Sequence, residues 1–237
     1  MKSITKIAAL TVLCFVLLAV SCGCNSQPTS ANMPESYLIK TVKPINQNPN
    51  FPTACESVCA VMALRNANYS VTVSTFVDKC IDRSYSFYIR DEQLYGPDPY
   101  QFFCGEPRAD SGYGCFAPVI EKGIKRATNS KKSAVDTTGE TLDTLCQKYV
   151  INDQPVIVWA TVDMQESTPG KSWLLTDGTE FVWPSGEHAL LLIGYDSDTY
   201  IFADPMVGET VHYDKALTTQ RYEELGSQSV AVTASKN

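Results

Sequence analysis

The chain has 237 residues, of which 44% are apolar, and its formal net charge is −7 at pH 7. These values are typical of a globular protein, and a chain of this length can bury the core of one domain. Because binding to phosphates requires a basic face, the negative charge argues against a nucleic-acid partner. We expect a monomer that needs neither a cofactor nor a metal ion.

The N-terminus has the layout of a secretory signal peptide, with two lysines and then an apolar run at residues 7–20. That run is too short for a permanent membrane span. The sequence "LLAVSC" resembles a bacterial lipobox, in which a cysteine, here Cys22, is lipidated after cleavage in front of it. We therefore expect an extracellular protein that a lipid anchors to the cell membrane, with plain secretion as the alternative. Cleavage removes both lysines and changes the net charge to about −9.

Three parts follow from this reading. Residues 1–21 form the lipoprotein signal peptide, residues 22–36 form the lipidated N-terminus and a polar tether, and residues 37–237 form the globular domain. Within the domain, residues 37–42 alternate as in a strand and residues 58–64 are apolar on all sides, which is typical of a buried helix.

The middle of the chain contains a second helical pattern and then many turn signals. We expect a helix at 73–81, and a long ordered excursion with little regular structure at 82–118, because Gly-Pro-Asp-Pro and Gly-Tyr-Gly interrupt it. Further helices are expected near 118–127 and 140–150.

The last third is rich in β-branched and aromatic residues between turns. It predicts strands at 155–161, 179–183, 189–195 and 199–203, a helix at 214–225 and a last strand at 229–233. Helices gathered before strands favour an α+β fold rather than a βαβ alternation. We expect an N-terminal helical part, with a buried central helix, packed on a mostly antiparallel β-sheet.

Cys55 lies at the start of the expected buried helix. Thr53 and Glu56 have the spacing of a capping box, which would make Cys55 the second helical residue. Unpaired amides and the helix dipole favour negative charge there, so we expect a lowered thiol pKa. Many structural cysteines also lie near helix starts. Cys59, one turn further on, is expected to be an inert core cysteine, with a disulfide partner as the alternative.

A nucleophilic thiol needs a base, and the chain has two histidines, His188 and His212. His188 opens the apolar strand "HALLLIGY", where a histidine is often only a polar terminus. A tight turn at 195–198 would place Asp204 of the next strand opposite His188, and directly opposed residues point to the same face. Asp204 would then orient the imidazole. We expect His212 to be structural or exposed.

Gln47 precedes the cysteine by eight residues in "INQNPNFPTAC". The loop through Pro49 and Pro52 can turn back over the helix start, so the Gln47 amide and the amide of Cys55 could stabilise the negative charge that grows during acyl transfer. Taken alone, Gln47 is a polar loop residue.

The order of Gln47, Cys55, His188 and Asp204 resembles that of papain-like cysteine peptidases. The stretches "NQNPNFPTACES", "GPDPYQFFCGEP", "GYGCFAPVI", "QPVIVWATVDM", "EHALLLIGYD" and "FADPMVG" are more closely similar to a secreted bacterial branch related to bacteriocin-processing, double-glycine leader peptidases. The similarity spans residues 40–233. Ala54 departs from the branch, which usually has glycine at this position.

The resemblance implies a papain-like fold and hydrolysis of an amide bond through an acyl-enzyme. Cys55 would be the nucleophile, His188 the general base and then acid, Asp204 the orienting residue, and Gln47 part of the oxyanion hole. The substrate would be a peptide or a cell-wall peptide. Two alternatives are a cell-wall peptide amidase or acyl or peptidyl transferase, and a catalytically inactive binding lipoprotein of the same fold.

The other cysteines and the tryptophans have structural readings. Cys104 and Cys115 flank a glycine-containing loop and could form a disulfide, with pairing to Cys80 as the competitor. A zinc site is not favoured, because no Cys-x-x-Cys pair appears among the cysteines of the domain. Trp159 and Trp183 are expected to pack in the core and sheet. Trp173 could belong to either the core or a substrate cleft.

Overall fold

The computed structural model describes residues 33–130 and 133–233. The expected signal peptide, Cys22 and all but the last four residues of the expected tether lie outside these residues. Within the described residues, no helix has the length and apolar character needed to cross a membrane.

The centre of the fold is a seven-stranded sheet with the order β12-β11-β10-β7-β13-β6, in which β1 also pairs with β10. Every strand pair of this sheet is antiparallel. Its strands are β1 (Tyr37–Leu38), β6 (Ala134–Asp136), β7 (Val156–Thr161), β10 (Glu187–Tyr195), β11 (Thr199–Asp204), β12 (Glu209–Asp214) and β13 (Ser229–Val232). The predicted α+β class and antiparallel sheet are confirmed.

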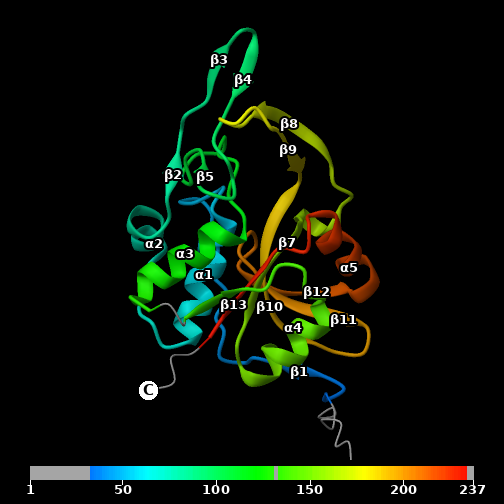
Figure 1. Ribbon diagram of the computed structural model, residues 1–237. Helices are drawn as coiled ribbons and strands as arrows, with labels where there is room; N and C mark the ends of the chain where they lie inside the picture. The colour runs from blue at the N-terminus through cyan, green and yellow to red at the C-terminus, as the bar shows by residue number, and fades with distance from the viewer. Residues whose placement is uncertain (1–32, 131–132, 234–237) are drawn as a thin grey trace, which may run out of the picture. The chain divides into compact units, whose positions relative to one another are not determined.

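Helices cover the sheet. They are α1 (Cys55–Asn66), α2 (Val73–Lys79), α3 (Ala117–Thr128), α4 (Leu142–Lys148) and α5 (Lys215–Glu224), with short 3-10 turns at Val150–Asn152 and Val162–Met164. In Figure 1, α1, α2 and α3 lie on one side of the sheet and α5 lies on the other. Every residue of α1 from Cys55 to Leu64 is buried, as its apolar sequence predicts.

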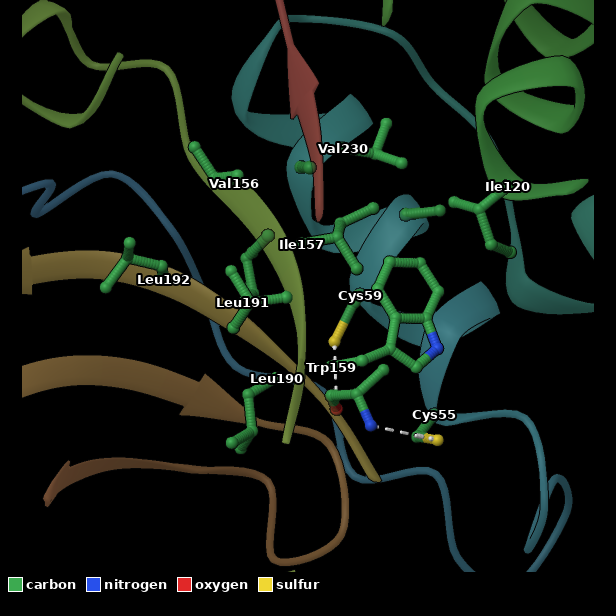
Figure 2. Packing of buried hydrophobic residues seen from close by; sticks show 14 of the residues in the cluster. Cys55, Cys59, Ile120, Val156, Ile157, Trp159, Leu190, Leu191, Leu192 and Val230 are labelled. Carbon is green, nitrogen blue, oxygen red and sulfur yellow. Dashed lines mark hydrogen bonds between the residues drawn. The ribbon is translucent and has the colours of Figure 1, made fainter. Parts of the chain in front are cut away.

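The core lies between α1 and the middle strands β7 and β10. Trp159 of β7 is fully buried, and its indole nitrogen donates a hydrogen bond to the Cys115 carbonyl oxygen at 2.9 Å. Figure 2 shows Trp159 between Cys59 and Cys55, beside Ile157 of the same strand. The core positions predicted for Trp159 and Cys59 are confirmed.

The excursion at 82–118 is more regular than expected. It contains β2 (Arg83–Ser84), β3 (Tyr88–Arg90), β4 (Gln93–Tyr95) and β5 (Phe103–Cys104), and β3 and β4 join β8 (Thr168–Leu174) and β9 (Glu180–Ser185) in a four-stranded sheet. Aromatic rings hold this second sheet to the domain, since Tyr113 contacts Trp173, and Phe116 contacts Phe181 and Trp183. Trp173 and Trp183 are both buried, so they are packing residues.

The six cysteines of the described residues are all buried and free, so the expected link between Cys104 and Cys115 is absent. An isolated antiparallel bridge pairs Cys104 with Gly114. Cys115 is the next residue along, and successive side chains of an extended chain leave opposite faces. The Cys104 thiol instead donates toward the carbonyl oxygens of Pro97 and Phe102, each at 3.6 Å. The competing link to Cys80 is also absent.

Candidate active site

Helix α1 begins at Cys55, and the expected capping box does not form. Ala54 is the N-cap residue and no side chain caps the helix. The Thr53 hydroxyl donates instead to the carbonyl oxygens of Glu106 and Ala109, at 3.2 and 3.0 Å. Glu56 accepts a hydrogen bond from the Cys115 amide at 2.6 Å. Thr53 and Glu56, the two residues of the expected capping box, therefore bind the 105–115 loop to the start of α1 through hydrogen bonds.

The Ala54 backbone explains why alanine fits a position where the branch usually has glycine. Its φ is −113° and its ψ is 34°, which a residue with a Cβ adopts without left-handed strain. The Ala54 amide donates to the Phe51 carbonyl oxygen at 3.1 Å, so a turn delivers the chain into α1.

The Cys55 sulfur lies against the first residues of β10. It accepts a hydrogen bond from the Ala189 amide at 3.4 Å and lies 3.6 Å from the carboxyl group of Glu56, to which the thiol donates. The Cys59 thiol donates to the carbonyl oxygen of the same Ala189 at 3.4 Å. The dashed lines from Cys55 and Cys59 in Figure 2 mark these two contacts with β10.

The surroundings of Cys55 change the electrostatic prediction. Cys55 is 6% exposed, and burial, followed by the nearby carboxyls of Glu56 and Glu187, raises its thiol pKa well above the ordinary value. The expectation of a lowered pKa is therefore wrong for this conformation. The helix start is present, but desolvation and two acidic neighbours outweigh its dipole.

His188 and Asp204 meet as the sequence predicts. His188 Nε2 and Asp204 Oδ1 are 2.8 Å apart, and both side chains are buried. Burial opposes ionisation of Asp204, but the hydrogen bond from His188 and the charge of its ring, with the Met206 amide, outweigh it and lower the Asp204 pKa. Because Nε2 is engaged, Nδ1 is the ring nitrogen left for a reacting group.

The two strands pair in a different register from the one expected. Leu191 faces Ala203 and Tyr195 faces Tyr200, with a shift between Leu192 and Gly194. His188 is therefore not directly opposite Asp204, and the two side chains meet diagonally at the end of the hairpin. The predicted contact is present although the predicted register is wrong.

Gln47 connects the two halves of the site. Its backbone amide donates to the Pro205 carbonyl oxygen at 2.8 Å, next to Asp204, and its side-chain amide donates to the Pro52 carbonyl oxygen at 2.6 Å, just before α1. Gln47 is 2% exposed, and Oε1 has no hydrogen-bond partner among the described residues. The loop does turn back over the helix start, as its prolines suggested.

Sequence reasoning missed the acidic character of this site. The sequence pattern predicts a capping role for Glu56 and gives no signal for Glu187, which directly precedes His188. The Cys55 sulfur and a carboxyl oxygen of each glutamate lie within 4.8 Å of one another. His212 is on β12, where half of its side chain is exposed, as expected. The expectation that the chain needs no cofactor or metal stays a prediction.

Comparisons with known proteins identify the family and the fold of this chain. A sequence model of the Peptidase_C39 like family matches residues 39–230. A C39-like peptidase from Bacillus anthracis has the same fold, with a TM-score of 0.73 and 23% identity, over 86% of this chain and 100% of that one. Xylellain, a cysteine protease from Xylella fastidiosa, aligns with a TM-score of 0.43 and 11% identity, over 87% of this chain and 88% of that one.

Among curated proteins, none matches this chain. The family match covers most of the chain, including Cys55, His188, Asp204 and Gln47. This chain therefore belongs to the Peptidase_C39 like family, within the papain-like cysteine peptidase superfamily.

Proposed function

We propose that this protein is an extracellular, lipid-anchored cysteine peptidase that hydrolyses peptide or amide bonds through a thioester on Cys55. The observation that carries the proposal is the convergence of three distant segments. The start of α1 supplies the thiol, the β10–β11 hairpin supplies the His188–Asp204 pair at 2.8 Å, and the Gln47 loop is hydrogen-bonded to both.

Attack begins with transfer of the Cys55 proton to His188 Nδ1. Asp204 holds Nε2 and stabilises the resulting imidazolium. The sulfur lies beside Ala189, the residue after His188, and the proposed transfer requires the thiol to turn from Glu56 toward the ring. The thiolate then adds to the substrate carbonyl carbon, and negative charge moves to the carbonyl oxygen.

That oxygen requires hydrogen-bond donors. The Cys55 amide belongs to the first turn of α1, where backbone N–H groups lack helical partners. Gln47 Nε2 donates one hydrogen to Pro52 and has a second one to offer. When the tetrahedral intermediate collapses, imidazolium donates its proton to the leaving amine. Water then hydrolyses the thioester, with His188 as base.

Labelling and hydrolysis test this function together. Iodoacetamide should modify Cys55 in the folded protein, and Cys55→Ala should abolish hydrolysis of a peptide library that the unsubstituted protein cleaves. Cys59→Ala is the matched control, because Cys59 is on the same helix but is buried against the Ala189 carbonyl oxygen. Loss of hydrolysis in both variants, or a Cys55 that stays unlabelled while the protein is folded, would contradict the proposal.

The substrate class is tested separately. A membrane-anchored enzyme outside the cell meets wall peptides, so digests of purified peptidoglycan with mass-spectrometric readout distinguish peptide hydrolysis from amidase or transferase chemistry. A transferase would join an added amine to the acyl group in place of water. A folded protein that is labelled at Cys55 but acts on neither substrate would be a binding lipoprotein.

The anchor rests on the lipobox sequence. Cys22→Ala should eliminate the lipid mass on the N-terminal peptide and release the protein into the medium of an expressing bacterium. Cys24→Ala is the control, since Cys24 lies two residues after the expected lipidation site Cys22. A secreted, unlipidated protein with Cys22 intact would support plain secretion instead.

A further inference from the structure

We propose that Glu56 and Glu187 share a proton beside Cys55 and set the pH at which its thiol ionises, keeping it protonated and directed toward Glu56 in the resting enzyme. Both are positioning residues that act through Cys55. The inference rests on the proposed function in its assignment of Cys55 as the nucleophile, and it goes further by naming what controls that nucleophile.

The geometry of this acidic group is tightly defined. Glu56 is fully buried and is fixed through the Cys115 amide at 2.6 Å, while the Cys55 thiol donates to its other oxygen at 3.6 Å. Glu187 Oε1 is buried and has no hydrogen-bond partner among the described residues. Gly114 covers the group, and a Cβ at that position would collide with Glu56.

The other charged and titratable groups near Glu56 and Glu187 provide little positive charge to stabilise the two carboxylates. Helix α1 presents Cys55, Glu56 and Cys59, and β10 presents Glu187 and His188. The end of β5 presents Cys104, the loop before α3 presents Cys115, and the end of β11 presents Asp204. The only basic side chain in this set is His188, which is already paired with Asp204. Glu56 is buried and Glu187 is partly buried with its Oε1 enclosed, and two carboxylates this close together cannot both ionise easily there, so retention of one proton by the pair is expected.

The titration behaviour of the group agrees with this geometry. Burial raises the pKa of Glu56 to about 7, although its hydrogen bond from the Cys115 amide acts in the opposite direction. Burial and the charge of Glu56 raise the Glu187 pKa well above its ordinary value. Each negative charge gained by the pair makes the thiolate of Cys55 less favourable. Proton uptake by the pair removes that penalty and frees the thiol to meet His188 Nδ1.

A protonated thiol reacts slowly with oxidants and electrophiles, since the thiolate is the reactive form. The pair would therefore protect the nucleophile outside the cell, where conditions are oxidising. In this arrangement the thiol becomes reactive when substrate binding moves it away from Glu56.

The test is the pH dependence of iodoacetamide alkylation at Cys55, followed by peptide mapping. Glu187→Gln leaves a single carboxyl group beside Cys55, so the charge there cannot pass −1 as the pH rises, and the half-maximal pH should fall by one unit or more. Glu187→Asp keeps the charge and should restore a profile close to that of the unsubstituted protein. Glu180→Gln is the matched control, because it removes an exposed glutamate of β9 and should leave the profile unchanged.

Cys59 and Cys115 report folding in the same experiment, because both are buried and should stay unlabelled. A Glu187→Gln profile that coincides with that of the control overturns the inference while leaving the peptidase proposal intact. Absence of Cys55 labelling at every pH would instead contradict the proposed function.

If Glu187→Gln does not fold, infrared spectroscopy of the unsubstituted protein decides the question. A carbonyl band from a protonated carboxyl should persist at pH 6, where ordinary glutamates are ionised. Its absence at that pH overturns the inference.

Discussion

Asp204 Oδ1 accepts two hydrogen bonds, one from His188 Nε2 and one from the Met206 amide, each at 2.8 Å. Because the backbone N–H can only donate, it holds an oxygen at this position. Asp204→Asn should therefore keep its side-chain oxygen facing the imidazole and lose only the charge. We expect kcat/KM for peptide hydrolysis to fall about 10-fold in Asp204→Asn and about 100-fold or more in Asp204→Ala.

Steady-state kinetics over a range of pH measure this difference. We expect the loss in kcat/KM to come from a lower kcat rather than from a higher KM, because Asp204 acts on the proton transfer and not on substrate binding. Asp196→Asn is the control, since this aspartate caps the β10–β11 turn through Thr199 and Asp198 and is far along the hairpin from the His188–Asp204 pair. Equal losses in the Asn and Ala variants of Asp204 would contradict the argument.

Gly114 lies where the 105–115 loop packs against Glu56 at the start of helix α1. Its φ is +138°, and a Cβ there would collide with the Glu56 carboxyl group that binds the Cys115 amide. Gly114→Ala should therefore loosen the 105–115 loop from α1 and lower the free energy of unfolding by about 2–4 kcal/mol. Urea denaturation provides the measurement.

Gly139 is the matched control for backbone strain alone. Its φ is +90°, yet no atom lies within 4 Å of where its Cβ would be. Gly139→Ala should cost about 1 kcal/mol. If the two alanine variants were equally stable, contact with Glu56 would not be what requires glycine at position 114.

The strands and helices of this domain could be predicted more readily than their contacts. Helix α1 and strands β7, β10 and β11 could be recognised from continuous apolar runs, because these elements are buried on both sides. Strands β6, β8 and β12 were missed, since β6 has three residues and the other two are largely polar. The predicted strand at 37–42 is confined to Tyr37–Leu38.

At the site, the residue identities could be predicted and their exact partners could not. A tight turn predicted that His188 and Asp204 meet, but the turn is longer than expected, since Tyr195 pairs with Tyr200, and the shift between Leu192 and Gly194 moves the register only one residue back. A capping box joins residues three positions apart, whereas the Glu56 carboxyl group accepts its hydrogen bond from the amide of Cys115, 59 residues away. A short motif does not show that a distant loop binds its carboxylate. It also does not show that burial raises the pKa of the Cys55 thiol, where the helix start alone predicts a lowered one.

The pH dependence of stability follows from the same buried acid and concerns the whole molecule. Burial raises the Glu56 pKa to about 7, while the unfolded chain releases this proton near pH 4.5. Between these values the folded protein holds a proton that the unfolded chain has lost, so the free energy of unfolding falls as the pH rises. The loss is on the order of 3 kcal/mol. Glu187 acts in the same direction.

Chemical denaturation at pH 5 and pH 8 should therefore show greater stability at pH 5. Carboxyls with lowered pKa values, such as Asp204, contribute stability that is lost only as the pH falls below about 4, so they do not mask the effect. Glu56→Gln should reduce the dependence, because its amide does not titrate and only the contribution of Glu187 remains, whereas Glu180→Gln should preserve it. A protein that is equally stable at both pH values, or more stable at pH 8, would show that Glu56 ionises in the folded state as easily as in the unfolded chain.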